Sequence, residues 1–224
     1  MTRNLSSMTS ITRAVIDSQP WLQDPRVVPI PWRESVFEEI QNRKLVIGVM
    51  YDDGVVKVHP PIERALTEIT ERLKEAGHEI VEWDASLHKE SIAIMDAYYT
   101  ADGGEDIRRS IQAGGEPFIP HVKALINKGT PISVYEYWQI NKRKLAIQKA
   151  YLEKWNAVKG PVSGRAVDVL LTPTMGHIAV PHNSCRYARC YSVFNDVGLT
   201  RDLIGGSDIP KFGIYWIIRH LRFR

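Results

Sequence analysis

An apolar strand, a helix and a second strand follow one another between Leu45 and Trp83, and this segment restricts the fold more than any other. Residues 45–50 (LVIGVM) form a continuous apolar run, which is typical of a strand buried on both faces. Residues 51–54 predict a turn, in which Gly54 can supply a positive φ angle. The second strand is predicted over residues 79–83 (EIVEW).

A helix is predicted between these two strands. Pro60 and Pro61 suit its first turn, and Gly77 suits the position just beyond its end. Helical spacing puts one apolar face on Ile62, Leu66, Ile69, Leu73 and Ala76. A strand, a crossover helix and a parallel strand make a βαβ unit, whose sheet needs covering on both faces. The chain is therefore predicted to be an α/β protein.

Further elements are predicted on both sides of this unit. Helices are expected over residues 8–17, 88–99, 106–112, 118–127 and 133–158, and a buried strand over residues 168–171. Four prolines between Pro20 and Trp32 predict an irregular, extended crossing. The inner face of the longest helix is predicted to carry Val134, Trp138, Leu145, Leu152 and Trp155.

Charge and composition exclude several classes of function. The hydrophobic fraction is 44% and the charged fraction 25%, as in ordinary globular proteins. Residues 1–196 hold 24 Lys and Arg against 24 Asp and Glu, so the net charge of +3 arises in the last 28 residues. This balance gives no electrostatic basis for a nucleic-acid or membrane partner. No run of eighteen apolar residues or signal-peptide core occurs, so a cytoplasmic location is expected; the oligomeric state stays open.

Four candidate metal ligands lie within fourteen residues: His177, His182, Cys185 and Cys190. Zinc favours such donors, and a metal-dependent hydrolase is one hypothesis that they allow. Their spacing is irregular, however. Polar loop residues and partly buried thiols are the preferred interpretation, and we expect neither a metal nor a cofactor.

Two predicted strands end in segments that can border a ligand. In open α/β sheets, crevices lie beyond the carboxyl ends of strands. The first such end is residues 51–53, and the second is Thr172, Pro173, Thr174 and Met175. Asp52 and Asp53 are adjacent in a tight turn, so capping of backbone N–H groups is favoured over an acid/base pair. His59 is interpreted as a surface turn residue.

The amino-acid sequences of three separated segments resemble the amidase signature family, especially its fungal acetamidase-like branch. The second half of the family is resembled by IGVMYDDG and HPPIERALTEITERLKEAGHEIVEW, within residues 47–83. The family's segment beyond its catalytic Gly/Ser region is resembled by MTRNLSSMTSITRAVIDSQPWLQDPRVVPIPWR (1–33). A later strand and loop of the family are resembled by RAVDVLLTPTMGHIAVPHNSCRY (165–187). The resemblance is collinear from Met1 to about Asn195. It implies a partial α/β/α sandwich with a mixed sheet, whose N-terminal catalytic half is missing.

The resemblance also implies a chemistry that this chain does not encode. The family hydrolyses amides with a Ser nucleophile, a second Ser in a cis peptide and a Lys base, together with a Gly-Gly-Ser-type loop that stabilises the oxyanion. No GGSSGGS-like run occurs here. Ser6-Ser7 is interpreted as a helix start with N-capping, and Gly205-Gly206-Ser207 as a turn. No catalytic residue is therefore predicted, and residues 172–175 are expected to form only the wall of a substrate pocket.

The resulting expectation is a fragment of an amidase acting on linear carboxamides, inactive by itself. Residues 1–196 are expected to be the C-terminal portion of an amidase domain and residues 197–224 a divergent tail. An altered reading frame or unspliced segment explains that tail most economically; a basic amphipathic helix or an ordinary divergent element is the alternative. The rival hypothesis for the whole chain is a non-catalytic α/β binding or interaction module.

Overall fold

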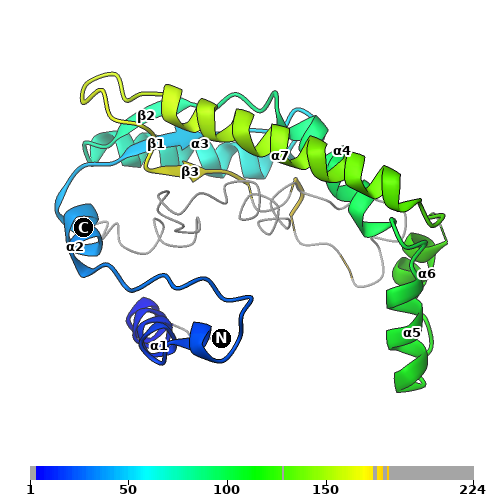
Figure 1. The fold of residues 1–224 in the computed structure, drawn as a ribbon. Coiled ribbons are helices and arrows are strands. Elements are labelled where there is room, and N and C mark those ends of the chain that lie inside the picture. Colours follow the sequence, from blue (N-terminus) through cyan, green and yellow to red (C-terminus); the bar gives the residue numbers. More distant parts are fainter. Residues whose placement is uncertain (1–3, 128, 174–175, 179–180, 182–224) are drawn as a thin grey trace. The chain divides into compact units, whose positions relative to one another are not determined.

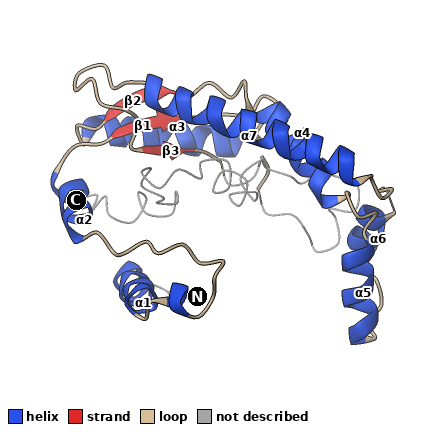
Figure 2. Cartoon of the chain, viewed as in Figure 1, coloured by secondary structure: helices blue, strands red, loops and turns tan. Residues whose placement is uncertain are grey.

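The α/β class predicted from the sequence is confirmed by a computed structural model, which describes residues 4–127, 129–173, 176–178 and 181 (Figures 1 and 2). The described residues fall into two compact units, one ending at Leu45 and the other beginning at Val46. The tail predicted over residues 197–224 lies outside the described residues.

The second unit is built around a three-stranded parallel sheet in the order β2-β1-β3. The strands are β1 (Val46–Val49), β2 (Glu79–Glu82) and β3 (Val169–Leu171). Ile47 pairs with Ile80 on one side and with Val169 on the other. The predicted βαβ unit and the predicted later strand are thus present, and β1 is the central strand of the described sheet.

Helix α3 (Pro60–Glu75) makes the crossover between β1 and β2. Pro60 occupies the first helical position, where a missing N–H costs nothing. The helix ends before Gly77, whose φ of 85° is left-handed and favours glycine. Leu66 and Leu73 on its inner face are buried, as the helical spacing predicts.

Alternate residues of β1 point to opposite faces of the sheet, and each face is covered by a helix (Figure 1). Val46 and Met50 pack with Tyr151 and Trp155 of α7 (Val134–Ala157) in one core cluster. Ile47 and Val49 alternate with these residues, so they point to the other face of the sheet, and both are buried. Central position and two-sided burial explain why the segment 45–50 is uniformly apolar.

At the amino end of the sheet, Asp168, the residue that precedes β3, is connected to β1 by hydrogen bonds. The Val46 N–H donates to the Asp168 carboxylate at 2.8 Å, and the Asp168 N–H donates to the Val46 carbonyl at 2.8 Å. This reciprocal pair sets the register of β3 against β1 just before the first paired residues.

The remaining helices of the second unit follow the predicted order. They are α4 (His88–Tyr99), α5 (Glu105–Gly114) and α6 (Pro120–Ile126), followed by α7. Ser133 caps α7 in a capping box with Glu136. Gly103 and Gly104, both with positive φ, separate α4 from α5 at the predicted exit.

The predicted inner face of α7 is wrong for three of its five residues. Val134, Trp138 and Leu145 are exposed, whereas Trp155 is buried as predicted and Leu152 is half-buried. The residues that are buried instead are Ile140, Ile147 and Tyr151. The error has a physical cause: α7 carries two apolar stripes roughly 120° apart around its axis, so periodicity alone cannot say which one meets the sheet.

The first unit consists of α1 (Leu5–Asp17), a 3₁₀ turn (Pro20–Leu22) and α2 (Glu34–Asn42). Asn4 caps α1, and its side chain accepts from the Ser7 N–H at 2.8 Å, so capping by Ser6-Ser7 was the wrong prediction. Helix α2 was not predicted. Among residues 4–44 none is buried, so this unit has no apolar core of its own in the described part.

Gly48 lies in the central strand and tests how tightly the side chains on one face of the sheet pack over it. A Cβ atom there would stand 2.5 Å from Leu170 Cδ2 and 3.3 Å from Trp83. Gly48→Ala is expected to lower the free energy of unfolding by about 1–3 kcal/mol through overpacking, measured by urea denaturation. Gly114→Ala is the control: its Cβ would have no contact closer than 3.6 Å. Equal stabilities of the two variants would contradict this packing.

Candidate functional site

The two strand ends that were predicted to border a crevice lie next to each other. Val49 of β1 pairs with Leu171 of β3, and the Met50 N–H donates to the Leu171 carbonyl at 3.0 Å. The segments that leave these strands therefore start side by side at the carboxyl edge of the sheet. We call residues 50–59 and 172–178 the edge loops; Thr174 and Met175 within them lie outside the described residues.

A second contact joins the edge loops farther from the sheet. The His59 N–H donates to the Gly176 carbonyl at 2.8 Å. The rings of His59 and His177 are 6.3 Å apart, and His177 Nδ1 is 2.7 Å from the Ile178 carbonyl oxygen. His59 is exposed, as expected for a surface turn residue.

Thr172 and Pro173, the first two residues of the predicted pocket wall, are buried. Within the described part of the chain, the Thr172 hydroxyl has no hydrogen-bond partner. A buried hydroxyl without a partner costs free energy, so this group is suited to meet a polar atom that the described residues do not supply.

Asp52 and Asp53 cap backbone groups in the turn after β1. Asp52 accepts from the Gly54 N–H at 2.8 Å, and Asp53 accepts from the N–H groups of Val55 and Val56 at 2.8 and 2.7 Å. Asp53 is buried by this arrangement. The two carboxylates thus hold the turn, in agreement with the capping interpretation.

A buried pair of polar side chains, His88 and Tyr151, was missed by sequence reasoning. His88, at the start of α4, is only 2% exposed, and its Nε2 lies 3.3 Å from the Tyr151 hydroxyl of α7. Burial lowers the pKa of His88, an effect that the nearby Asp53 carboxylate opposes. Burial also raises the pKa of Tyr151 to about 12. A single histidine in the segment SLHKES gives no sequence signal of such a position.

The ion pair between Lys154 and Asp84 lies beside this pair. Hydrogen bonding from Lys154 and from Ser86 lowers the pKa of the Asp84 carboxyl to about 2. Lys154 also lies over the Trp83 ring, 5.4 Å from its centroid. The Lys154 side chain therefore contacts both a carboxylate and the face of an aromatic ring.

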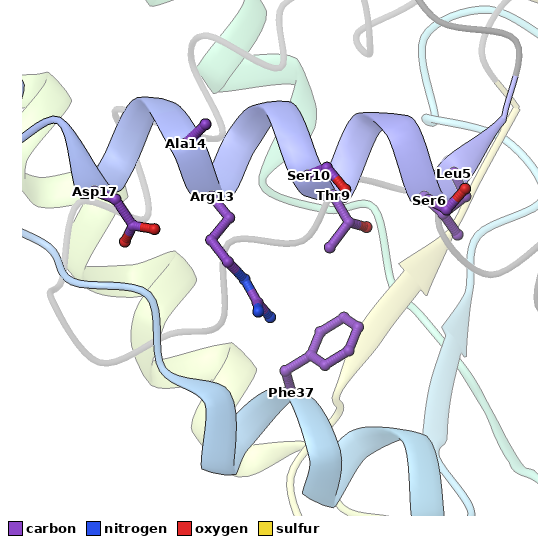
Figure 3. A pocket seen from close by; sticks show the side chains of 8 residues that line it. All are labelled: Leu5, Ser6, Thr9, Ser10, Arg13, Ala14, Asp17 and Phe37. Carbon is purple, nitrogen blue, oxygen red and sulfur yellow. The ribbon is translucent and has the colours of Figure 1, made fainter.

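Ser6 and Ser7 do not form a catalytic arrangement with a base. Ser6 lines a groove of about 530 Å³ between α1 and α2, together with Leu5, Thr9, Ser10, Arg13, Ala14, Asp17 and Phe37 (Figure 3). Arg13 pairs with Glu34 and lies over the Trp32 ring. A guanidinium stays charged in proteins and cannot take a proton from a serine.

No group of three or more metal-ligating side chains occurs among the described residues. Of the four candidate ligands in the sequence, His177 is described, whereas His182, Cys185 and Cys190 lie outside the described residues. The described helices likewise include none long and apolar enough to cross a membrane.

The buried Thr172 hydroxyl gives a stability prediction. Thr172→Val keeps the shape of the side chain but removes the unpartnered hydroxyl, so the free energy of unfolding is expected to rise by roughly 1 kcal/mol in urea denaturation. Thr67→Val serves as control, because the exposed Thr67 hydroxyl donates to the Glu63 carbonyl at 3.0 Å. A loss of stability in Thr172→Val would show that its hydroxyl is bonded.

The lowered pKa of His88 gives a pH prediction. The unfolded chain binds a proton at this histidine near its ordinary pKa of 6.5, whereas the folded chain resists protonation until lower pH. Stability is therefore expected to fall as the pH drops from about 7.5 to about 5.5, and His88→Gln is expected to flatten this fall. Denaturation midpoints at both pH values, with exposed His59→Gln as control, measure the effect. The same slope in both variants would contradict it.

Comparison with known proteins identifies the family to which this chain is related. The family model described as Amidase matches residues 1–201. "Amidase 1" of Gibberella moniliformis is 55% identical over 195 residues, which are 87% of this chain but 37% of that protein. "Acetamidase" of Emericella nidulans is 33% identical over 205 residues, covering 89% of this chain and 37% of the relative.

A solved structure shares the fold. It is a fatty acid amide hydrolase, with a TM-score of 0.63 and 26% identity over 80% of this chain and 30% of that protein. The chain thus spans less than two fifths of the relatives named here. With nine tenths of its residues matched by one family model, and with the fold of a solved relative, this chain belongs to the amidase family.

Proposed function

We propose that the chain is the C-terminal portion of an amidase that hydrolyses linear carboxamides to a carboxylate and ammonia, and that it is inactive by itself. The observation that carries this proposal is the combination of 55% identity to an amidase with coverage of only 37% of its length. The sequence also lacks a GGSSGGS-like run. The reactive groups of the amidase would then belong to polypeptide that this chain does not include.

The proposed reaction follows the chemistry that the family resemblance implies. A serine hydroxyl attacks the amide carbon while a lysine, through the bridging serine, takes its proton. The C–N bond breaks, ammonia leaves with a proton, and water hydrolyses the acyl-serine to the carboxylate. Backbone N–H groups stabilise the negative oxygen of each tetrahedral intermediate.

In this proposal the chain contributes the scaffold and one wall of the substrate pocket. Thr172, Pro173, Thr174 and Met175 are the proposed wall residues, at the carboxyl edge of the sheet where α/β proteins bind ligands. The buried, unpartnered Thr172 hydroxyl supports this, because a carboxamide offers both donors and acceptors of hydrogen bonds. A cytoplasmic location and the absence of a nucleic-acid partner belong to the same proposal and rest on composition and charge.

An ammonia-release assay tests the proposal. The purified chain is expected to release no ammonia from acetamide or an aryl amide above a protein-free control, because nucleophile and base are not encoded. Co-expression with the part of Amidase 1 outside the matched 195 residues is expected to yield ammonia release that a serine-directed phosphonate abolishes. Phosphonate-sensitive turnover by the chain alone would overturn the claim of inactivity.

A non-catalytic binding module is the second candidate function. It is favoured by the buried cluster of the second unit, in which Val46, Met50, Trp83, Tyr151 and Trp155 take part. Such a module unfolds in one cooperative transition as a monomer. Aggregation or a broad, non-cooperative transition would instead favour a fragment whose sheet edges lack partners.

A further inference from the structure

His88 is a buried titratable side chain at the contact between α4 and α7. Its imidazole is 2% exposed, and its Nε2 lies 3.3 Å from the Tyr151 hydroxyl oxygen of α7. The two rings are 5.9 Å apart. Leu87, one residue earlier, packs against the buried cluster that contains Trp83 and Tyr151. The start of α4 is therefore held on α7 by the His88 ring and by its neighbour.

The Tyr151 hydroxyl can donate to His88 only while the imidazole is neutral. Burial raises the pKa of Tyr151 to about 12, so this hydroxyl keeps its proton near neutral pH. A neutral imidazole that is protonated on Nδ1 offers the lone pair of Nε2 as an acceptor. In the imidazolium ion both ring nitrogens are donors. Protonation of His88 therefore removes Nε2 as the acceptor of this hydrogen bond.

The position of His88 in its helix also disfavours a positive charge. His88 is the first residue of α4. The N-terminal end of a helix carries a partial positive charge from its N–H groups, which disfavours a cation there, and burial adds the cost of desolvation. The next two residues, Lys89 and Glu90, are exposed and opposite in charge. An imidazolium ion at this position is therefore less stable in the core than in water.

Three charged side chains from other elements act on the His88 imidazole: Asp53 from the turn after β1, Asp84 after β2 and Lys154 from α7. Lys154 and Asp84 form an ion pair, so their effects on the imidazole oppose each other. Asp53 is only 6% exposed and accepts from two backbone N–H groups of its own turn. Its carboxylate is the main charge that stabilises the imidazolium form.

We propose that His88 is a pH-sensitive latch: uptake of a proton expels its side chain from the contact with Tyr151 and frees the first turn of α4 from α7. The two states are a closed form with a buried neutral imidazole and an open form with an exposed imidazolium. The proton selects between them, because it binds the open form more tightly. Asp53 sets the pH at which the latch opens. The latch lies within the second unit and does not depend on the proposed function.

Native-state amide hydrogen exchange of the full chain, followed by NMR between about pH 7.5 and pH 5.5, tests the latch. The Ser91 N–H donates to the Leu87 carbonyl at 3.2 Å and reports on the first turn of α4. Its protection factor is expected to fall by up to about tenfold for each pH unit below 6.5, because the open form binds one more proton. The Met50 N–H, bonded to the Leu171 carbonyl at 3.0 Å, reports on the sheet.

Urea separates local opening from unfolding of the whole unit. An opening of one helical turn exposes little surface, so exchange at Ser91 is expected to stay constant in low urea concentrations. Exchange at Met50 is expected to rise with urea, from a protection at least about tenfold higher than that of Ser91. Exchange at Ser91 that equals exchange at Met50 at every urea concentration would overturn the latch.

Two adjacent aspartates give a matched pair of variants that leave the histidine in place. Asp53→Asn keeps an oxygen for the N–H groups of the turn but removes the charge, so the titration midpoint of the His88 imidazole and the fall in Ser91 protection are expected to move to lower pH. Asp52→Asn changes an exposed carboxylate that accepts from the Gly54 N–H, and both quantities are expected to stay unchanged.

His88→Gln completes the test, because a neutral amide cannot take up the proton. Protection of the Ser91 N–H in this variant is expected to be independent of pH between about 7.5 and 5.5. This result, together with a shift in Asp53→Asn and none in Asp52→Asn, supports the latch. The same midpoint in Asp53→Asn and in the native chain overturns it, as does an unchanged pH dependence of Ser91 exchange in His88→Gln.

Discussion

Two-sided burial of the central strand β1 is the constraint on which the second unit depends. Because β1 pairs with β2 and with β3, its backbone N–H and C=O groups are used on both edges. Because α7 covers one face and α3 the other, each of its side chains loses contact with water. Gly48 lets Leu170 and Trp83 approach closely, so the α7 side of the sheet closes without a gap.

The carboxyl edge of this sheet follows from the same arrangement. Parallel pairing in register brings the ends of β1 and β3 together, and the edge loops begin there. Asp53 then stabilises its turn by accepting hydrogen bonds from two backbone N–H groups, and the buried His88 and Tyr151 side chains contact each other. These polar groups are buried and bonded to one another or to backbone, an arrangement that rigidifies this part of the core.

Several large apolar side chains are exposed on the described residues. The first unit has apolar residues such as Met8, Ile11 and Val15 on one helix but no buried residue between positions 4 and 44, and α7 exposes Trp138 and Leu145. Marginal stability leaves little room for large apolar surface in water, because burial of that surface is the main favourable term in folding. Under the proposal that the chain is one portion of a longer amidase domain, such apolar surface would be covered by the rest of that domain.

The amino-acid sequence by itself determined the local elements and their order. The apolar run at 45–50, the prolines at 60 and 61 and the glycine at 77 set one strand, a helix start and a helix end, since each acts through its own backbone or its immediate neighbours. The resemblance of three segments to amidases could likewise be recognised from the amino-acid sequence. Tertiary structure alone decided which face of α7 meets the sheet and that His88 reaches Tyr151 across 63 positions. Two apolar faces of one helix differ only in what packs against them, and that is fixed by contacts between distant parts of the chain.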